Sequence, residues 1–224
     1  MINDLKLGVK LMRYAYGVKT NIAISILLVV LGVFMTLGVN LLGVASNMPG
    51  GFAVMLAPMF LIQMLNSVNV TNMAKASPAK RRLQTSVPTA INLFFMLLGY
   101  VIVSIAEYIC VASIPERRGI ICGELFCIAT ISAILIIYMA VAYKSFAISI
   151  ILYVPAFFCS VYQGKLIGWG TELFAGMKHL FAFTVVAGSV VIAAACLLHY
   201  FITLAVYKVP MSKYAQAAPL RRWL

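Results

Sequence analysis

Charged residues are scarce in this sequence, and acidic ones are the scarcest. Only five of the 224 residues are Asp or Glu, against 17 Lys or Arg, and charged residues make up 10% of the chain. A soluble domain of average composition carries roughly 25% charged residues. Hydrophobic residues, by contrast, reach 64% here. The composition therefore excludes an ordinary soluble domain and indicates a polytopic membrane protein.

Motifs for catalysis and for cofactor binding are also lacking. The chain contains no G-x-S-x-G, no H-E-x-x-H and no G-x-x-x-x-G-K-[ST] sequence. Its two histidines, His179 and His199, are isolated, and its five cysteines form no C-x-x-C pair. We therefore expect no enzyme activity, no metal site and no cofactor in this chain. Whether Cys110 and Cys122, which flank one predicted loop, form a disulfide cannot be decided from the sequence.

Six apolar runs, each near the roughly 20 residues that a membrane crossing needs, lie between residues 21 and 207. We place them at 21–42, 51–71, 88–112, 121–143, 146–163 and 179–207. In residues 1–20, apolar side chains recur at helical spacing among basic ones, at Ile2, Leu5, Val9, Met12 and Tyr16. This pattern predicts an amphipathic helix on the membrane surface; a charged flank of the first span is the alternative. The expected fold is all-α, with one six-span domain at 21–207 and a basic tail at 208–224.

Basic residues are distributed unevenly among the connections. If the N-terminus is cytoplasmic, thirteen of the 17 Lys and Arg residues face the cytoplasm, and Asp4 is the one acid on that side. This bias predicts that both termini are cytoplasmic. Membrane topology then accounts for the net charge of +12. Nucleic acid is therefore not an expected partner, whereas anionic membrane lipid is.

The second connection, residues 72–88, is the longest polar stretch of the chain. It has no acid, and its basic residues are Lys75, Lys80, Arg81 and Arg82. Ser77-Pro78 is a typical helix start. Val87-Pro88 is expected to end the helix, because a residue before proline avoids the helical conformation. The sequence thus predicts a short basic helix at 77–85, which either sets topology alone or binds a soluble partner.

Polar residues within the predicted spans are costly unless they have a partner or a path for water. Amide side chains recur at three-residue steps in the second span, at Gln63, Asn66, Asn69 and Asn72. Methionines continue roughly the same face, and Glu107 is the one ionisable group clearly within a run. The candidate substrate path is therefore Met55, Met59, Gln63, Asn66 and Glu107. Hydrogen bonding between helices is the alternative role for the amides.

The glycine-broken segment 164–178 precedes the sixth span. It is predicted to be either a re-entrant or outer helix or a plain loop.

The stretch Ala76-Ser77-Pro78-Ala79-Lys80-Arg81-Arg82-Leu83-Gln84 carries a resemblance. Together with the N-terminal helix, the six spans and the irregular segment before the last span, it resembles the membrane subunit of ABC-2-type exporters. The likeness is to the small bacterial permeases of that group. In this family, the connection after the second span contains a coupling helix that docks on a separate ATPase subunit. The resemblance implies a coupling site formed by Lys75, Ser77, Pro78, Lys80, Arg81, Arg82 and Gln84. It also implies ATP and magnesium on the partner ATPase, and a second permease subunit, expected to be identical.

The expected function is that of a permease subunit of an ATP-driven exporter in the bacterial cytoplasmic membrane. The short connections leave no room for an extracellular domain. They fit a hydrophobic or amphipathic cargo, such as a peptide, better than a polysaccharide. The alternative is a membrane protein that does not transport, such as a scaffold, an immunity factor or an assembly partner.

Overall fold

The computed structural model describes residues 1–15, 17–41, 48–69, 71, 76–142, 144 and 180–209, together with residues 164, 165, 167, 168 and 172. Within these residues the chain is helical and contains no strand. The predicted fifth span, residues 146–163, lies outside the described residues. So do Lys75, most of segment 164–178 and the tail beyond residue 209.

Seven α-helices and one 3-10 helix make up the described elements: α1 (Ile2–Met12), α2 (Val18–Leu41), α3 (Met48–Asn69), α5 (Lys80–Gln84), α6 (Ser86–Ser113), η1 (Pro115–Arg117), α7 (Arg118–Ala142) and α10 (Leu180–Val206). Five helical stretches among the described residues are long and apolar enough to cross a membrane. They correspond to five of the six predicted spans. The chain is therefore an all-α protein with the character of a multi-pass membrane protein.

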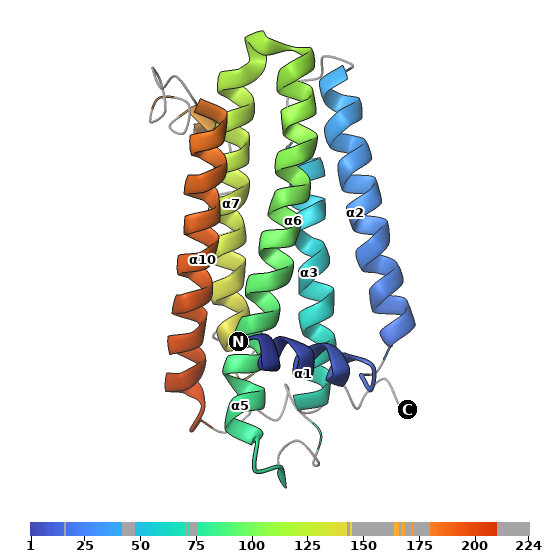
Figure 1. The fold of residues 1–224 in the computed structure, drawn as a ribbon, viewed down its shortest axis with the longest axis vertical. Helices are drawn as coiled ribbons and strands as arrows, with labels where there is room; N and C mark the ends of the chain where they lie inside the picture. The colour runs from blue at the N-terminus through green and yellow to red at the C-terminus, as the bar shows by residue number, and fades with distance from the viewer. Residues whose placement is uncertain are drawn as a thin grey trace.

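The five long helices stand side by side, and α1 lies across one end of them (Figure 1). We call this end, where α5 also lies, the α1 end. The turn from α6 through η1 into α7 lies at the opposite end. Gly17 joins α1 to α2 with a φ of 67°, a conformation that residues with a Cβ adopt at a cost. This glycine lets the chain turn from the crossing helix into the first long helix.

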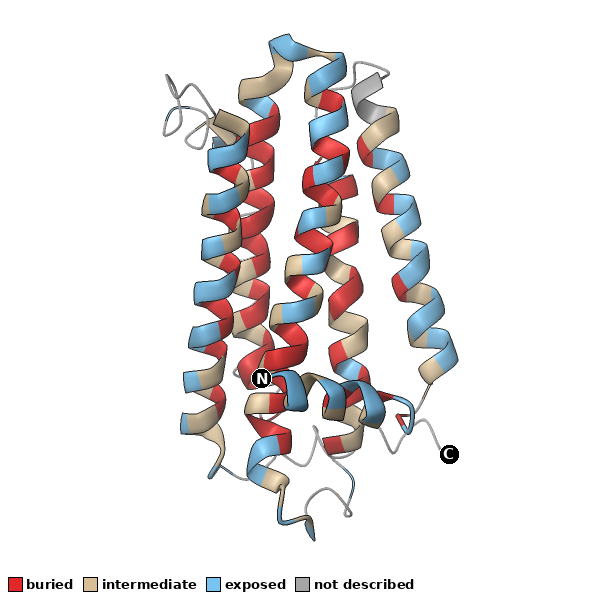
Figure 2. Ribbon diagram, viewed as in Figure 1, coloured by how far each residue is buried: buried red, intermediate tan, exposed pale blue. Residues whose placement is uncertain are grey.

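The core lies between α3, α6, α7 and α10, and their buried faces turn inward in Figure 2. Close approach depends on small residues, as is usual between apolar helices. A Cβ on Gly32 of α2 would lie 2.6 Å from the Gly50 carbonyl oxygen of α3, and a Cβ on Gly188 of α10 would overlap Tyr100 Oη of α6. The absence of a side chain at Gly188 therefore allows α10 to approach Tyr100 of α6 closely. Cys110 and Cys122 are both buried thiols, and no disulfide joins them.

The break between α5 and α6 corrects one prediction. Val87-Pro88 does not end the basic helix. Instead α5 ends at Gln84, Thr85 (φ −124°, ψ −78°) interrupts the helix, and α6 begins at Ser86. Pro88 lies in the first turn of α6, where its missing N–H would have no helical partner in any case. The start of the basic helix also differs from the prediction, because α5 begins at Lys80, with Ala79 at its N-cap and no side-chain cap. Ser77 Oγ accepts from the Ala79 N–H over 3.2 Å in the turn before α5.

The predicted apolar stripe of the first 20 residues is divided in the structure. Met12 is buried, whereas Ile2 and Val9 are 69% and 40% exposed. The face that meets α6 is centred on Gly8, where an added Cβ would lie 2.7 Å from a side-chain carbon of Ile91. One face of α1 therefore packs on the bundle, and a second apolar face points away from it.

Candidate functional site

The short basic helix α5 is held against the end of α3. The side chain of Leu83 in α5 is buried. Asn69 Nδ2, at the end of α3, donates a hydrogen bond to the Leu83 carbonyl oxygen over 3.0 Å. Only Thr85 separates α5 from α6. Arg81 and Arg82 are exposed on the other side of α5. Of the other predicted coupling residues, Lys80 is half-buried, Gln84 is buried, Ser77 and Pro78 precede α5, and Lys75 lies outside the described residues. The basic surface is therefore formed by Arg81 and Arg82, on a helix that is fixed to two of the long helices.

Arg82 also connects α5 to α1. Its Nε donates to Asp4 Oδ1, and Asp4 Oδ2 lies 3.7 Å from the N-terminal ammonium of Met1. Asp4 is the only acid in the first 20 residues. The ion pair orients Arg82 toward α1, whereas no acid among the described residues forms an ion pair with Arg81. Sequence analysis did not predict the Arg82–Asp4 pair, because the two residues are 78 positions apart.

Lys144, just beyond α7, is a buried basic residue at the same end. It is 4% exposed, and its Nζ donates to the carbonyl oxygens of Tyr207 at 3.0 Å and Val209 at 2.8 Å. These carbonyls follow the end of α10, where a helix leaves acceptors without intrahelical partners. Burial, and to a smaller extent the charge of Lys80, hold the pKa of Lys144 below its usual value of 10.5. Lys144 thereby joins the ends of α7 and α10 beside α5.

A buried polar group connects α6 and α10 a little further from this end. His199 Nδ1 lies 3.0 Å from Thr89 Oγ1, and His199 Nε2 lies 3.2 Å from Asn92 Nδ2. The Thr89 hydroxyl already donates to the Thr85 carbonyl, so it accepts from His199. Asn92 Nδ2 can only donate. These contacts require a neutral imidazole with its proton on Nδ1. His199 is thus hydrogen-bonded within the bundle, and sequence analysis did not identify Asn92 and Thr89 as its partners.

The five predicted substrate-path residues do not gather around one described cavity. Met55 and Glu107 are fully buried, Met59 and Asn66 are half-buried, and Gln63 is exposed. Met55 packs beside Gly99 of α6, whereas Glu107 lies farther along α6, toward the opposite end. The structure therefore distributes these side chains between the core and the surface of the bundle.

Glu124 corrects a second prediction, that no other acid joins Glu107 at membrane depth. It lies within α7 and is fully buried, as Glu107 is within α6. Sequence analysis named Glu107 as the one ionisable group clearly within an apolar run, although Glu124 lies near the start of the run 121–143. The helix in fact begins at Arg118. The half of the bundle farther from α1 thus contains two buried carboxylic acids.

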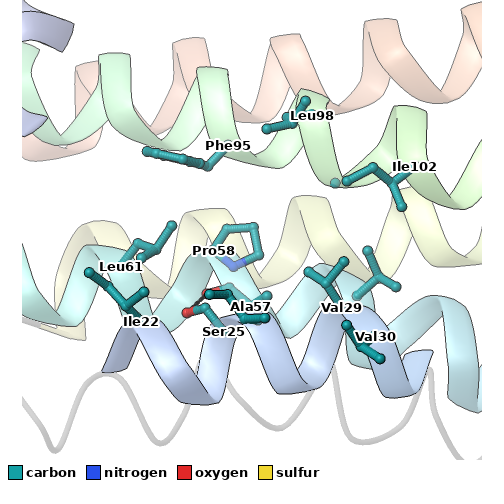
Figure 3. Close-up of a pocket in the computed structure, with 13 residues that line it drawn as sticks. Ile22, Ser25, Val29, Val30, Ala57, Pro58, Leu61, Phe95, Leu98 and Ile102 are labelled. Carbon is teal, nitrogen blue, oxygen red and sulfur yellow. Dashed lines mark hydrogen bonds between the residues drawn. The ribbon is translucent and has the colours of Figure 1, made fainter. Parts of the chain in front are cut away.

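An apolar groove of about 290 Å³ opens between α2, α3 and α6 (Figure 3). Pro58 lies within α3 and borders the groove, and Ser25 of α2 donates to the Ala57 carbonyl oxygen over 3.1 Å. Phe95 and Ile102 of α6 form the opposite side. The groove borders α3 near Met55 but contains none of the five predicted path residues. Its lining suits an apolar ligand.

Comparison with known proteins adds no neighbour to this description: no family model, no curated protein and no solved structure matches the chain.

Proposed function

We propose that this chain is a permease subunit of an ATP-driven exporter of the ABC-2 type, in the bacterial cytoplasmic membrane. The observation that carries the proposal is α5, a short helix with exposed arginines, fixed to the end of a bundle of apolar helices. A helix that only marks topology needs basic charge but no fixed conformation. A docking helix needs both, and α5 has both.

The attachments of α5 suggest how force on it would reach the bundle. Thr85 joins it to α6, the Asn69 amide joins it to α3, and Arg82 joins it to α1. A partner that binds Arg81 and shifts α5 would therefore act on three helices at once. In this proposal the α1 end faces the cytoplasm, where ATP is available and where basic residues are expected. ATP and magnesium would bind the partner subunit.

The cargo we propose is hydrophobic or amphipathic, such as a peptide. Two features support this class: the apolar lining of the groove in Figure 3, and the lack, among the described residues, of rings of like charge that would select ions. Met55, Met59, Gln63, Asn66 and Glu107 are the side chains we assign to the path. Their separation in one subunit is consistent with a path completed by a second permease subunit, which we propose to be an identical chain.

A scaffold or immunity role is the second candidate, and one observation favours it. The described core between α6, α7 and α10 is closely packed, with Tyr100, Ile128 and Ile192 fully buried. A protein that only binds others in the membrane needs such a core and no path.

The test of the proposal uses the ATPase expected from a reading frame beside that of this chain. The two proteins are expressed together, purified through a tag on this chain, and reconstituted in vesicles. We expect an ATPase to copurify and hydrolysis to depend on both subunits. A scaffold would copurify no ATPase and would show no nucleotide-dependent conformational change.

The contribution of α5 is tested with Pro78→Gly, Arg81→Ala and Arg82→Ala combined. Because Arg82 also bonds Asp4, a matched variant with Arg82→Ala alone separates the internal contact from docking. We expect the triple variant to insert normally and to lose hydrolysis coupled to export. Export equal to that of the parent chain would show that α5 only marks topology.

A further inference from the structure

A second apolar groove, of about 340 Å³, lies between α1 and α6. We call it the α1–α6 groove. Met1, Ile2 and Leu5 form one side, and α6 residues including Phe94 and Val101 form the other. Phe94 and Val101 are 46% and 47% exposed. The groove thus runs along the outward surface of α6 and ends beneath the first turn of α1.

An acyl chain fits this position better than water does. All nine side chains that line the α1–α6 groove are apolar, so water inside it would find few hydrogen-bond partners. If the five apolar helices cross a membrane, Phe94 and Val101 face lipid, and α1 lies across α6 near the end of these helices (Figure 1). A groove that opens to the bilayer and ends at a crossing helix matches the shape of a lipid tail below its headgroup.

The charges at the closed end of the groove favour one class of headgroup. Lys6 and Arg82 are exposed beside it, and Asp4 is the one acid among them. Asp4 bonds Arg82 and offsets its charge. Lys6, one turn after Ile2, adds a further positive charge on an exposed face of α1. The net charge next to the groove is positive.

We propose that the α1–α6 groove binds an acyl chain of an anionic phospholipid, with the headgroup held by Lys6 and Arg82. A second copy of this chain is a poorer occupant, because it would have to cover these charges with an acidic surface, and the chain has only five acids. The lipid supplies both the tail and the negative charge. The inference does not depend on export; it needs only that the long helices cross a membrane.

Fluorescence quenching by brominated lipids tests this site on the full chain. Trp169 and Trp223, the two tryptophans of the sequence, are replaced by Phe, and one reporter is introduced. The Phe94→Trp reporter lies in the α1–α6 groove. The Phe34→Trp reporter makes the same aromatic exchange on a 73% exposed position of α2 that lines neither groove. Each chain is reconstituted in vesicles that contain brominated phosphatidylglycerol or brominated phosphatidylcholine, and the relative association of the two lipids is measured.

At the groove reporter we expect phosphatidylglycerol to associate several-fold more strongly than phosphatidylcholine, on the order of fivefold for each basic group involved. Lys6→Gln should reduce this ratio about fivefold. Added salt should also reduce the ratio in the chain that keeps Lys6, so the salt dependence tests the proposal without the Lys6→Gln variant. The ratio at the α2 reporter should stay near one. Equal quenching by both lipids at the groove reporter would overturn the proposal, as would a ratio unaffected by salt and by Lys6→Gln. Absence of quenching by either lipid would mean that protein covers the groove, which also overturns it.

Discussion

The buried amine of Lys144 gives a prediction about pH and stability. Among the described residues, its Nζ donates to the carbonyl oxygens of Tyr207 and Val209. Burial disfavours the charged amine, and to a smaller extent so does the charge of Lys80, so the pKa is lowered. In the unfolded chain the amine is in water and titrates near 10.5. Between the lowered pKa of the folded state and 10.5, the unfolded chain therefore binds more protons.

The sign of the effect follows from proton linkage. Stability rises with pH wherever the unfolded state holds more protons. We therefore expect the free energy of unfolding to increase as the pH rises toward 10.5, by at most about 1.4 kcal/mol per pH unit. Lys144→Met removes both bonds, and its cost is expected at about 1–3 kcal/mol, because Val209 is exposed and water can satisfy part of the loss.

Unfolding by sodium dodecyl sulfate in mixed micelles, measured at several pH values, provides the assay. Lys144→Arg is the matched control, since arginine can donate to the same carbonyls and does not titrate in this range. The difference in stability between the parent and Lys144→Arg should grow with pH in favour of the parent. A difference that is independent of pH, or that changes with the opposite sign, would refute the reasoning.

Three further predictions concern contacts between helices, and the same unfolding assay measures each of them. Gly188→Ala should destabilise by about 1–3 kcal/mol, because the methyl group would overlap the tyrosine hydroxyl of α6; Gly38→Ala, with nothing within 4 Å of the added atom, should be neutral or stabilising. A double-mutant cycle on Arg82 and Asp4 should give a coupling of about 0.2–1 kcal/mol, since the arginine side chain is 51% exposed. His199→Leu should cost about 0.6–2 kcal/mol for each interhelical bond lost, and a cost near zero would mean that these bonds do not form.

Five of the six predicted spans coincide with long apolar helices, whereas the predicted fifth span lies outside the described residues. The predicted run 88–112 compares with α6 at Ser86–Ser113, and 179–207 compares with α10 at Leu180–Val206. This accuracy has a physical cause: a chain that crosses lipid must bond its backbone internally along an apolar stretch of fixed length. The division of α1 into an inward and an outward apolar face was less predictable. Both faces are apolar, and the sequence does not state which one meets α6.

The polar contacts were the part that sequence analysis missed. Arg82 and Asp4 are 78 residues apart, Lys144 and Val209 are 65 apart, and His199 and Asn92 are 107 apart. Helical periodicity shows which residues share a face of one helix but not which helix meets that face. The end of α5 was misplaced for a related reason. Proline disfavours the helix interior, yet the first turn accepts it, and the sequence alone did not show that a second helix begins at Ser86.

The central claim is that α5 binds an ATPase, and binding affinity tests it most directly. The full chain is placed in lipid nanodiscs, and its equilibrium binding to the ATPase from the adjacent reading frame is measured. Arg81→Glu reverses an exposed charge on α5. Lys10→Glu reverses an exposed charge on α1 at the same end of the bundle. The claim predicts that the parent binds the ATPase, that Arg81→Glu weakens binding at least tenfold, and that Lys10→Glu changes it less than threefold. Equal affinities for the parent and Arg81→Glu, or no binding by the parent, would contradict it.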